Sequence, residues 1–166
     1  MKAVLCILIF GACVGLGGFI WNKYKTRKNF FENLVSFCEA LLVEIAFSKN
    51  TVRKIIEIYG AGYCRPFRAI LLAYQALVDA KSDITREKIG AFVGDTFLKP
   101  EERGMLIEFF HDLGRHGVDG ETAKVQSKKS AFETFLQTAM AALRNDASIY
   151  LKCFIIMGIA GVVIIL

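Results

Sequence analysis

The two histidines of the chain lie close together in a polar stretch that could bind a metal ion. Residues 111–124 read HDLGRHGVDGETAK. Adjacent His and Asp residues are metal ligands in some helical phosphohydrolases, so one hypothesis is a small hydrolase using His111, Asp112 and His116. However, His111 and His116 are five residues apart, about 140° around a helix, whereas a helical metal pair needs a spacing of four. The chain has no third histidine to complete such a site.

The competing interpretation is that this stretch is the corner between two helices. Gly114 follows Leu113 where a helix C-cap is expected. Arg115 and the next residues would form the turn, and Asp119 and Glu121 have the residue types that start a helix, as N-cap and first-turn acid. This pattern favours a structural corner over a catalytic centre.

Other catalytic signatures are absent from the sequence. No phosphate-binding glycine loop, nucleophile elbow or zinc-type cysteine spacing occurs. Glu39 and Glu44 are five residues apart, and we expect them on a solvated flank rather than as an acid/base pair. The sequence therefore predicts a protein that is not an enzyme and binds no cofactor or metal.

Both ends of the chain are strongly apolar. Residues 3–21 are nineteen uncharged residues, close to the roughly twenty that a membrane-spanning helix needs. Residues 153–166 are uncharged too, and at about 1.5 Å per residue they require Ile149 to Leu151 and a snorkelling Lys152 to span. We predict transmembrane helices at 1–22 and 152–166, around a cytoplasmic domain at 23–151.

The charge pattern sets the expected topology. Four basic residues follow the first apolar run between positions 23 and 28, so the positive-inside rule places the middle of the chain in the cytoplasm and both termini on the far side. Anionic membrane lipids account for this basic collar without nucleic acid. A cleaved signal peptide is the alternative for the first run, but no small-residue cleavage site follows it.

The middle of the chain reads as helix throughout. Apolar residues recur at steps of three and four, no segment alternates with a period of two, and only two prolines occur. We predict an all-α fold, a cytoplasmic helical bundle flanked by the N- and C-terminal transmembrane helices. The last helix would run about 50 Å from the corner at 114–118 to Lys152, which would place the corner at the membrane-distal tip.

Three glycines mark one face of the first apolar run. Gly11, Gly15 and Gly18 share a helix face, a pattern that lets another transmembrane helix approach closely. Glycine is also common in transmembrane helices without such a role.

Taken in order, these features resemble the stage III sporulation protein AB family. The matching elements are the two apolar ends, the basic collar, the segment LLVEI at 41–45, and Leu113-Gly114 with Asp119. The chain departs from the family pattern because no proline follows Thr51, the corner is about two residues longer, and Glu121 stands where a glutamine is usual.

The resemblance implies a non-enzymatic component of the channel, or feeding tube, between mother cell and forespore. It implies similarity to the platform proteins of type II secretion and type IV pilus systems, and a place in the mother-cell membrane around the forespore. The expected partners are other membrane proteins of the channel and a hexameric secretion-type ATPase, the AA protein of the same operon. Glu44, Gly114, Arg115, Asp119 and Glu121 are the candidate partner-surface residues. A general secretion or pilus platform is the alternative.

Overall fold

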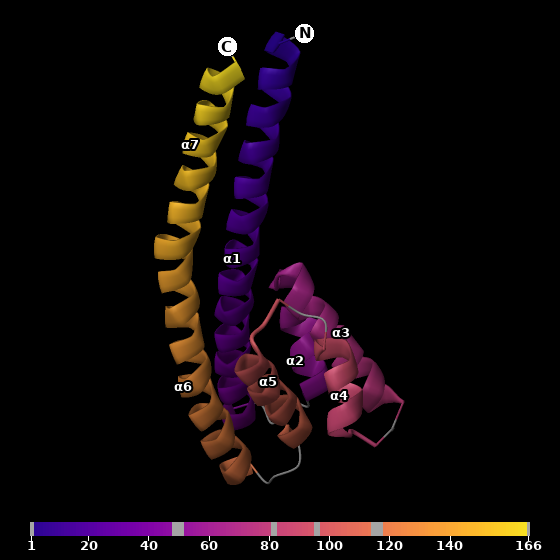
Figure 1. Ribbon diagram of the computed structural model, residues 1–166. Coiled ribbons are helices and arrows are strands. Elements are labelled where there is room, and N and C mark those ends of the chain that lie inside the picture. Colours follow the sequence, from indigo (N-terminus) through magenta and orange to yellow (C-terminus); the bar gives the residue numbers. More distant parts are fainter. Residues whose placement is uncertain (1, 48–51, 81–82, 95–96, 114–117, 166) are drawn as a thin grey trace. The chain divides into compact units, whose positions relative to one another are not determined.

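The chain is helical in every regular element that the structure describes. The computed structural model describes residues 2–47, 52–80, 83–94, 97–113 and 118–165, and no residue in these ranges lies in a strand (Figure 1). The predicted all-α class is confirmed. The helices are α1 (Lys2–Phe47), α2 (Val52–Tyr59), the short 3₁₀ helix η1 (Gly60–Gly62), α3 (Arg65–Asp79), α4 (Arg86–Val93), α5 (Pro100–Asp112), α6 (Val118–Ala142), the π-helical turn η2 (Leu143–Ala147) and α7 (Ser148–Ile165).

The chain forms two compact units. The paired-helix unit comprises Met1–Lys28 and Gln137–Leu166, and the bundle unit comprises Asn29–Leu136. Helices α1 and α6 each contribute residues to both units. The paired-helix unit thus takes in more of the chain than the two predicted spans at 1–22 and 152–166.

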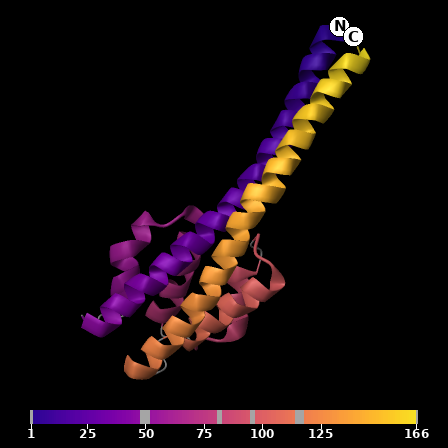
Figure 2. The same ribbon diagram turned by 90° about the vertical axis from the view of Figure 1, so that its left-hand side faces the viewer.

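In the paired-helix unit, α1 and α7 lie side by side and antiparallel. The start of α1 and the end of α7 lie at the same end of the pair (Figures 1 and 2). Two glycines mark the close approach. A Cβ atom built on Gly17 would lie 3.1 Å from Leu151 Cδ1 and 3.4 Å from Phe154 Cβ, and one on Gly158 would lie 3.1 Å from Phe10 Cδ2. At each of these points one helix has no side chain, so a side chain of the other helix packs directly against its backbone.

The paired-helix unit exposes many large apolar side chains. They include Ile7, Phe19, Ile156 and Val163, each more than 60% exposed. Among the described residues, one helix, Gly120–Val163, is long and apolar enough to cross a membrane. The predicted N-terminal span includes side chains that lie outside the described part, and it stays a prediction.

Aromatic rings form the centre of the bundle unit. Phe30 is fully buried, and its ring meets those of Phe31, Phe67 and Phe97 edge to face, with centroids 5.4–5.7 Å apart. This geometry directs positive ring edges at negative ring faces. A second cluster forms where Phe109 packs edge to face on neighbouring rings of α5 and α6. The buried phenylalanine rings therefore fill the core of the bundle unit.

Local sequence signals account for several helix starts. Thr85 is the N-cap of α4 and accepts a hydrogen bond from the Lys88 backbone N–H at 3.4 Å. Pro66 lies in the first turn of α3, and Pro100 begins α5, positions where the missing proline N–H would have no helical partner anyway. Glu102 in the first turn of α5 accepts a hydrogen bond from the Lys99 backbone N–H at 2.9 Å, which satisfies a donor that no helical carbonyl can reach.

Apolar periodicity describes the helix faces unevenly. In α1, Phe31, Leu34, Cys38 and Leu41 recur at steps of three and four, and all are buried. The same periodicity places Val78 of α3 and Met140 of α6 on apolar faces, yet they are 38% and 37% exposed.

Candidate functional site at the ends of α5 and α6

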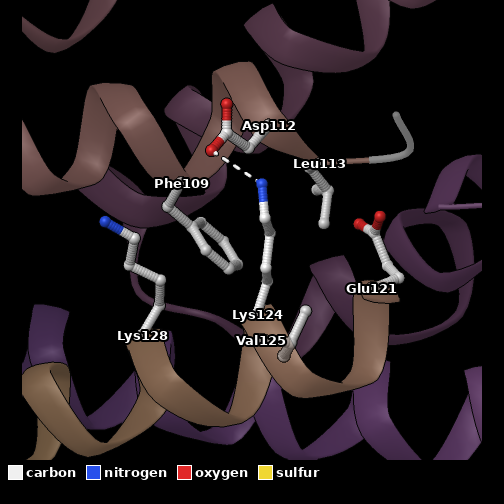
Figure 3. Close-up of a pocket in the computed structure, with 7 residues that line it drawn as sticks. All are labelled: Phe109, Asp112, Leu113, Glu121, Lys124, Val125 and Lys128. Carbon is white, nitrogen blue, oxygen red and sulfur yellow. Dashed lines mark ion pairs between the residues drawn. The ribbon is translucent and has the colours of Figure 1, made fainter. Parts of the chain in front are cut away.

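The candidate site lies where the end of α5 faces the start of α6. Two ion pairs join the helices: Lys128 Nζ lies 2.7 Å from Glu108 Oε2, and Lys124 Nζ lies 3.6 Å from Asp112 Oδ2. Both acids and both lysines are four residues apart, so each helix presents its pair on one face. The partners run in opposite order along the two helices, as expected for antiparallel neighbours. Figure 3 shows the Asp112–Lys124 pair.

Asp112 is also held by its neighbour His111. The His111 Nδ1 and Asp112 Oδ1 atoms are 3.0 Å apart. Because an ionised carboxylate only accepts hydrogen bonds, Nδ1 carries the proton in this contact. The hydrogen bond from His111, together with the charge of Lys124, lowers the pKa of Asp112. Lys128 lowers the pKa of Glu108 in the same way, so both acids are ionised near neutral pH.

A small hollow lies between these helices. It is lined by Phe109, Asp112, Leu113, Glu121, Lys124, Val125 and Lys128 (Figure 3). It has room for about one water molecule, far less than a metabolite requires. Val125 and Phe109 close it on the apolar side, and Glu121, only 7% exposed, contributes its carboxylate. The hollow is therefore too small to enclose a substrate, and its charged rim is the part of this site that another molecule could contact.

The described residues do not provide a set of ligands for the metal site that the two histidines suggest. No group of three His, Cys, Asp or Glu side chains within the described ranges could hold a metal ion. His116, the third residue of the hypothesis, lies outside the described residues. The arrangement at His111 and Asp112 is a hydrogen-bonded pair that faces Lys124, and a cation beside Asp112 competes with metal binding.

The other corner residues are only partly described. Gly114 and Arg115 lie outside the described residues, as does the side chain of Asp119. Helix α5 ends at Asp112, and Leu113 follows as an extended C-cap residue whose N–H donates to the Phe109 carbonyl at 3.1 Å. The buried Tyr74 hydroxyl donates to the Leu113 carbonyl at 3.3 Å. These contacts fix the end of α5 just before the corner.

Glu44 does not lie on a solvated flank. It is 9% exposed, because Tyr59 at the end of α2 covers it and donates a hydrogen bond to its Oε1 at 3.3 Å. Partial burial and this hydrogen bond raise the pKa of Tyr59. Glu39 is on the surface as expected, with 57% of its side chain exposed, and pairs with Lys129 at 2.9 Å. Glu44 therefore joins α1 to α2.

The three glycines of the first apolar run are open. A Cβ atom on Gly11, Gly15 or Gly18 would meet nothing within 4 Å. Helix α7 instead contacts α1 at Gly17, on a different face. The packing role of the three glycines stays a prediction, since nothing in the described part of the paired-helix unit packs against them.

Sequence reasoning missed Lys124, Lys128 and Glu108. A signal for them was present, because acids at 108 and 112 and lysines at 124 and 128 repeat with the same spacing on either side of the predicted corner. For an antiparallel helix pair, such spacing brings opposite charges together. Tyr59 was missed because nothing local in the sequence links it to Glu44.

Comparison with known proteins identifies the family. The family model for stage III sporulation protein AB matches residues 2–166. No curated protein and no solved structure matches the chain. Since the match covers nearly every residue, including the apolar ends, the LLVEI segment and the corner, the chain belongs to the stage III sporulation protein AB family.

Proposed function

We propose that the protein is a non-enzymatic membrane scaffold of a sporulation channel between mother cell and forespore. Family membership supports a role in sporulation. The observation that carries the scaffold role is the contrast between the two units: one exposes large apolar side chains along paired helices, and the other has a closed aromatic core.

The paired-helix unit would anchor the protein in the membrane. Exposed apolar surface on this scale would aggregate in water, whereas in a bilayer it contacts lipid tails. Both spans would cross from the cytoplasmic side, with the termini on the far side of the mother-cell membrane. The prediction is that the protein stays with membranes after alkaline carbonate extraction, and release into the soluble fraction would contradict the anchor.

The bundle unit would bind a hexameric secretion-type ATPase through the corner between α5 and α6. The exposed charges there support this choice, since half of the Lys124 and Glu108 side chains is exposed, at 50% and 51%. Charges of both signs at the rim of a small hollow give an interface specificity and orientation. The candidate residues Arg115, Asp119 and Glu121 belong to the same corner.

Binding of purified ATPase to the full-length protein in lipid nanodiscs tests this docking. Lys124→Glu reverses a charge at the rim and should weaken binding several-fold, mainly through slower, salt-dependent association. Lys54→Glu on α2 is the matched control, because it makes the same charge change on an exposed residue of the same unit. Equal binding by both variants would place the docking surface elsewhere.

Metal analysis separates the scaffold from the hydrolase hypothesis. We expect no stoichiometric metal in the purified full-length protein. Stoichiometric metal that disappears in His111→Ala would overturn the scaffold proposal in favour of a metal-dependent enzyme.

A further inference from the structure

A surface groove lies between α2 and α3 in the bundle unit. Arg53 at the start of α2 forms an ion pair with Asp79 at the end of α3, with the Nη1 and Oδ1 atoms 3.2 Å apart, so the two helices are antiparallel. The groove lies toward their other ends, which η1 joins, and has a volume of about 170 Å³. Since a cavity of about 150 Å³ holds benzene, the groove has room for one leucine or phenylalanine side chain.

The floor of the groove is apolar and its edge is polar. Ile56, Gly60 and Leu71 line it and are buried. Leu72 lines it too, but 52% of this residue is exposed. The polar residues that line the groove are Glu57, Arg68 and Gln75. An apolar pocket inside a polar rim is the arrangement in which protein interfaces receive an anchoring side chain.

The charges around the groove favour an acidic partner. Arg53 pairs with Glu57 at 3.1 Å as well as with Asp79, so both acids of the segment 52–79 already have a cation beside them. Arg68 is exposed, and its side chain makes no hydrogen bond or ion pair in the described part of the chain. The segment carries four basic residues against two acidic ones, so a second copy of this chain would bring like charges together here.

We propose that this groove binds an amphipathic segment of another protein, with one apolar side chain seated on Ile56 and Leu71 and an aspartate or glutamate paired with Arg68. The buried apolar side chain supplies most of the affinity, and the ion pair fixes the orientation of the segment. The groove shares no residue with the corner between α5 and α6. The proposal therefore rests neither on ATPase docking at that corner nor on the membrane anchor.

Site-specific photo-crosslinking of the full-length protein in sporulating cells tests the proposal. A benzophenone amino acid replaces Leu72, and the matched control places it at Val43, which is 53% exposed and does not line the groove. We expect position 72, but not 43, to link to a segment of another protein. Because Leu72 and Arg68 are one helical turn apart, mass spectrometry should find an acidic residue within about four residues of the linked position.

Several crosslinking results would overturn the proposal. These are a link from position 72 to lipid alone, to a second copy of the chain or to a segment without an acid, and the absence of any link from position 72. The same segment linked equally from positions 43 and 72 would also overturn it, because the contact would then not be specific to the groove.

A groove-filling variant tests the apolar contact. Ala61→Trp fills the groove from an exposed position and should reduce the crosslink at least about tenfold, as for the loss of a well-packed anchor residue. Ala91→Trp is the matched control, because Ala91 is exposed on α4 and does not line the groove. Both positions lie outside the aromatic core, so the fold is kept. An unchanged yield in Ala61→Trp would contradict the seated side chain.

A charge reversal tests the ion pair. Arg68→Glu should reduce the crosslink by about fivefold, the upper range for one exposed ion pair, and Arg68→Lys should retain most of it. Lys124→Glu makes a matched reversal at the other surface and should leave the yield unchanged. Fluorescence anisotropy with a synthetic peptide of the linked segment completes the test: changing the peptide acid to lysine should restore its binding to the Arg68→Glu protein. Equal losses in Arg68→Glu and Lys124→Glu, or no restoration, would overturn the pairing with Arg68.

Discussion

A cysteine at position 158 should form a disulfide with the native Cys13. A Cβ atom built on Gly158 lies 3.3 Å from Cys13 Cβ, and disulfides have Cβ–Cβ distances of about 3.5–4.5 Å, with a mean of about 3.8 Å. Gly158→Cys therefore requires the helices to separate by only about half an ångström at this point. The ring of Phe10, 3.1 Å from the same Cβ position, must also turn slightly.

Peptide mapping provides the assay. In full-length protein in which Cys6 and Cys153 are replaced by serine, mild oxidation in the membrane should join the tryptic peptides 3–23 and 153–166. Reduction should separate them. A low protein-to-lipid ratio limits links between different molecules, so the joined peptides report the pairing of α1 and α7 within one chain.

A glycine on the open face of α1 provides the matched control. Gly15→Cys, combined with Gly158→Cys and with serine at positions 6, 13 and 153, puts the α1 cysteine where its Cβ has nothing within 4 Å, so no link to position 158 should form within the chain. If Gly158→Cys gives no linked peptides under oxidation, the helices do not meet in the register described above.

Three further predictions concern the bundle unit. Phe30→Ala should lower the free energy of unfolding by about 3–5 kcal/mol, because it empties the centre of the aromatic cluster. Val43→Ala, at a position 53% exposed, should lower it by less than about 1 kcal/mol. Denaturant titration of the detergent-solubilised protein measures both values. Burial raises the pKa of the Cys38 thiol to about 12, so at pH 8 maleimide should label it about a thousandfold more slowly than in the unfolded chain, and after Cys64, which is less buried. Equal rates for the folded and unfolded chain in mass spectrometry would contradict the burial. Lys128 lowers the pKa of Glu108 in the folded state, so the ion pair stabilises the fold above the unfolded pKa of about 4.3, and this stabilisation is lost as the pH falls through the folded pKa. Glu108→Gln should therefore lower the free energy of unfolding by less than about 1 kcal/mol at pH 7 and leave it unchanged at pH 2. Thermal unfolding at both pH values measures the difference.

The helical class and most helix starts could be predicted from the sequence because their causes are local. Pro66, Thr85 and Pro100 act on their own turn of backbone, and apolar periodicity identifies a buried face whatever covers it. The burial of Glu44 could not be predicted in this way. Its cover, Tyr59, lies fifteen residues along the chain on another helix, and neither local propensity nor periodicity shows which helix will lie over a given side chain.

The glycines of α1 show the same limit within a single helix. The spacing of Gly11, Gly15 and Gly18 correctly describes a shared helix face, yet α7 packs at Gly17, which is outside that pattern. Periodicity identifies which residues lie on one side of a helix, but the neighbour is chosen by the complementary surface, here the gap that Gly158 leaves opposite Phe10 and Cys13. Because α7 uses another face of α1, the face formed by the three glycines has nothing within 4 Å of it in the described part of the chain.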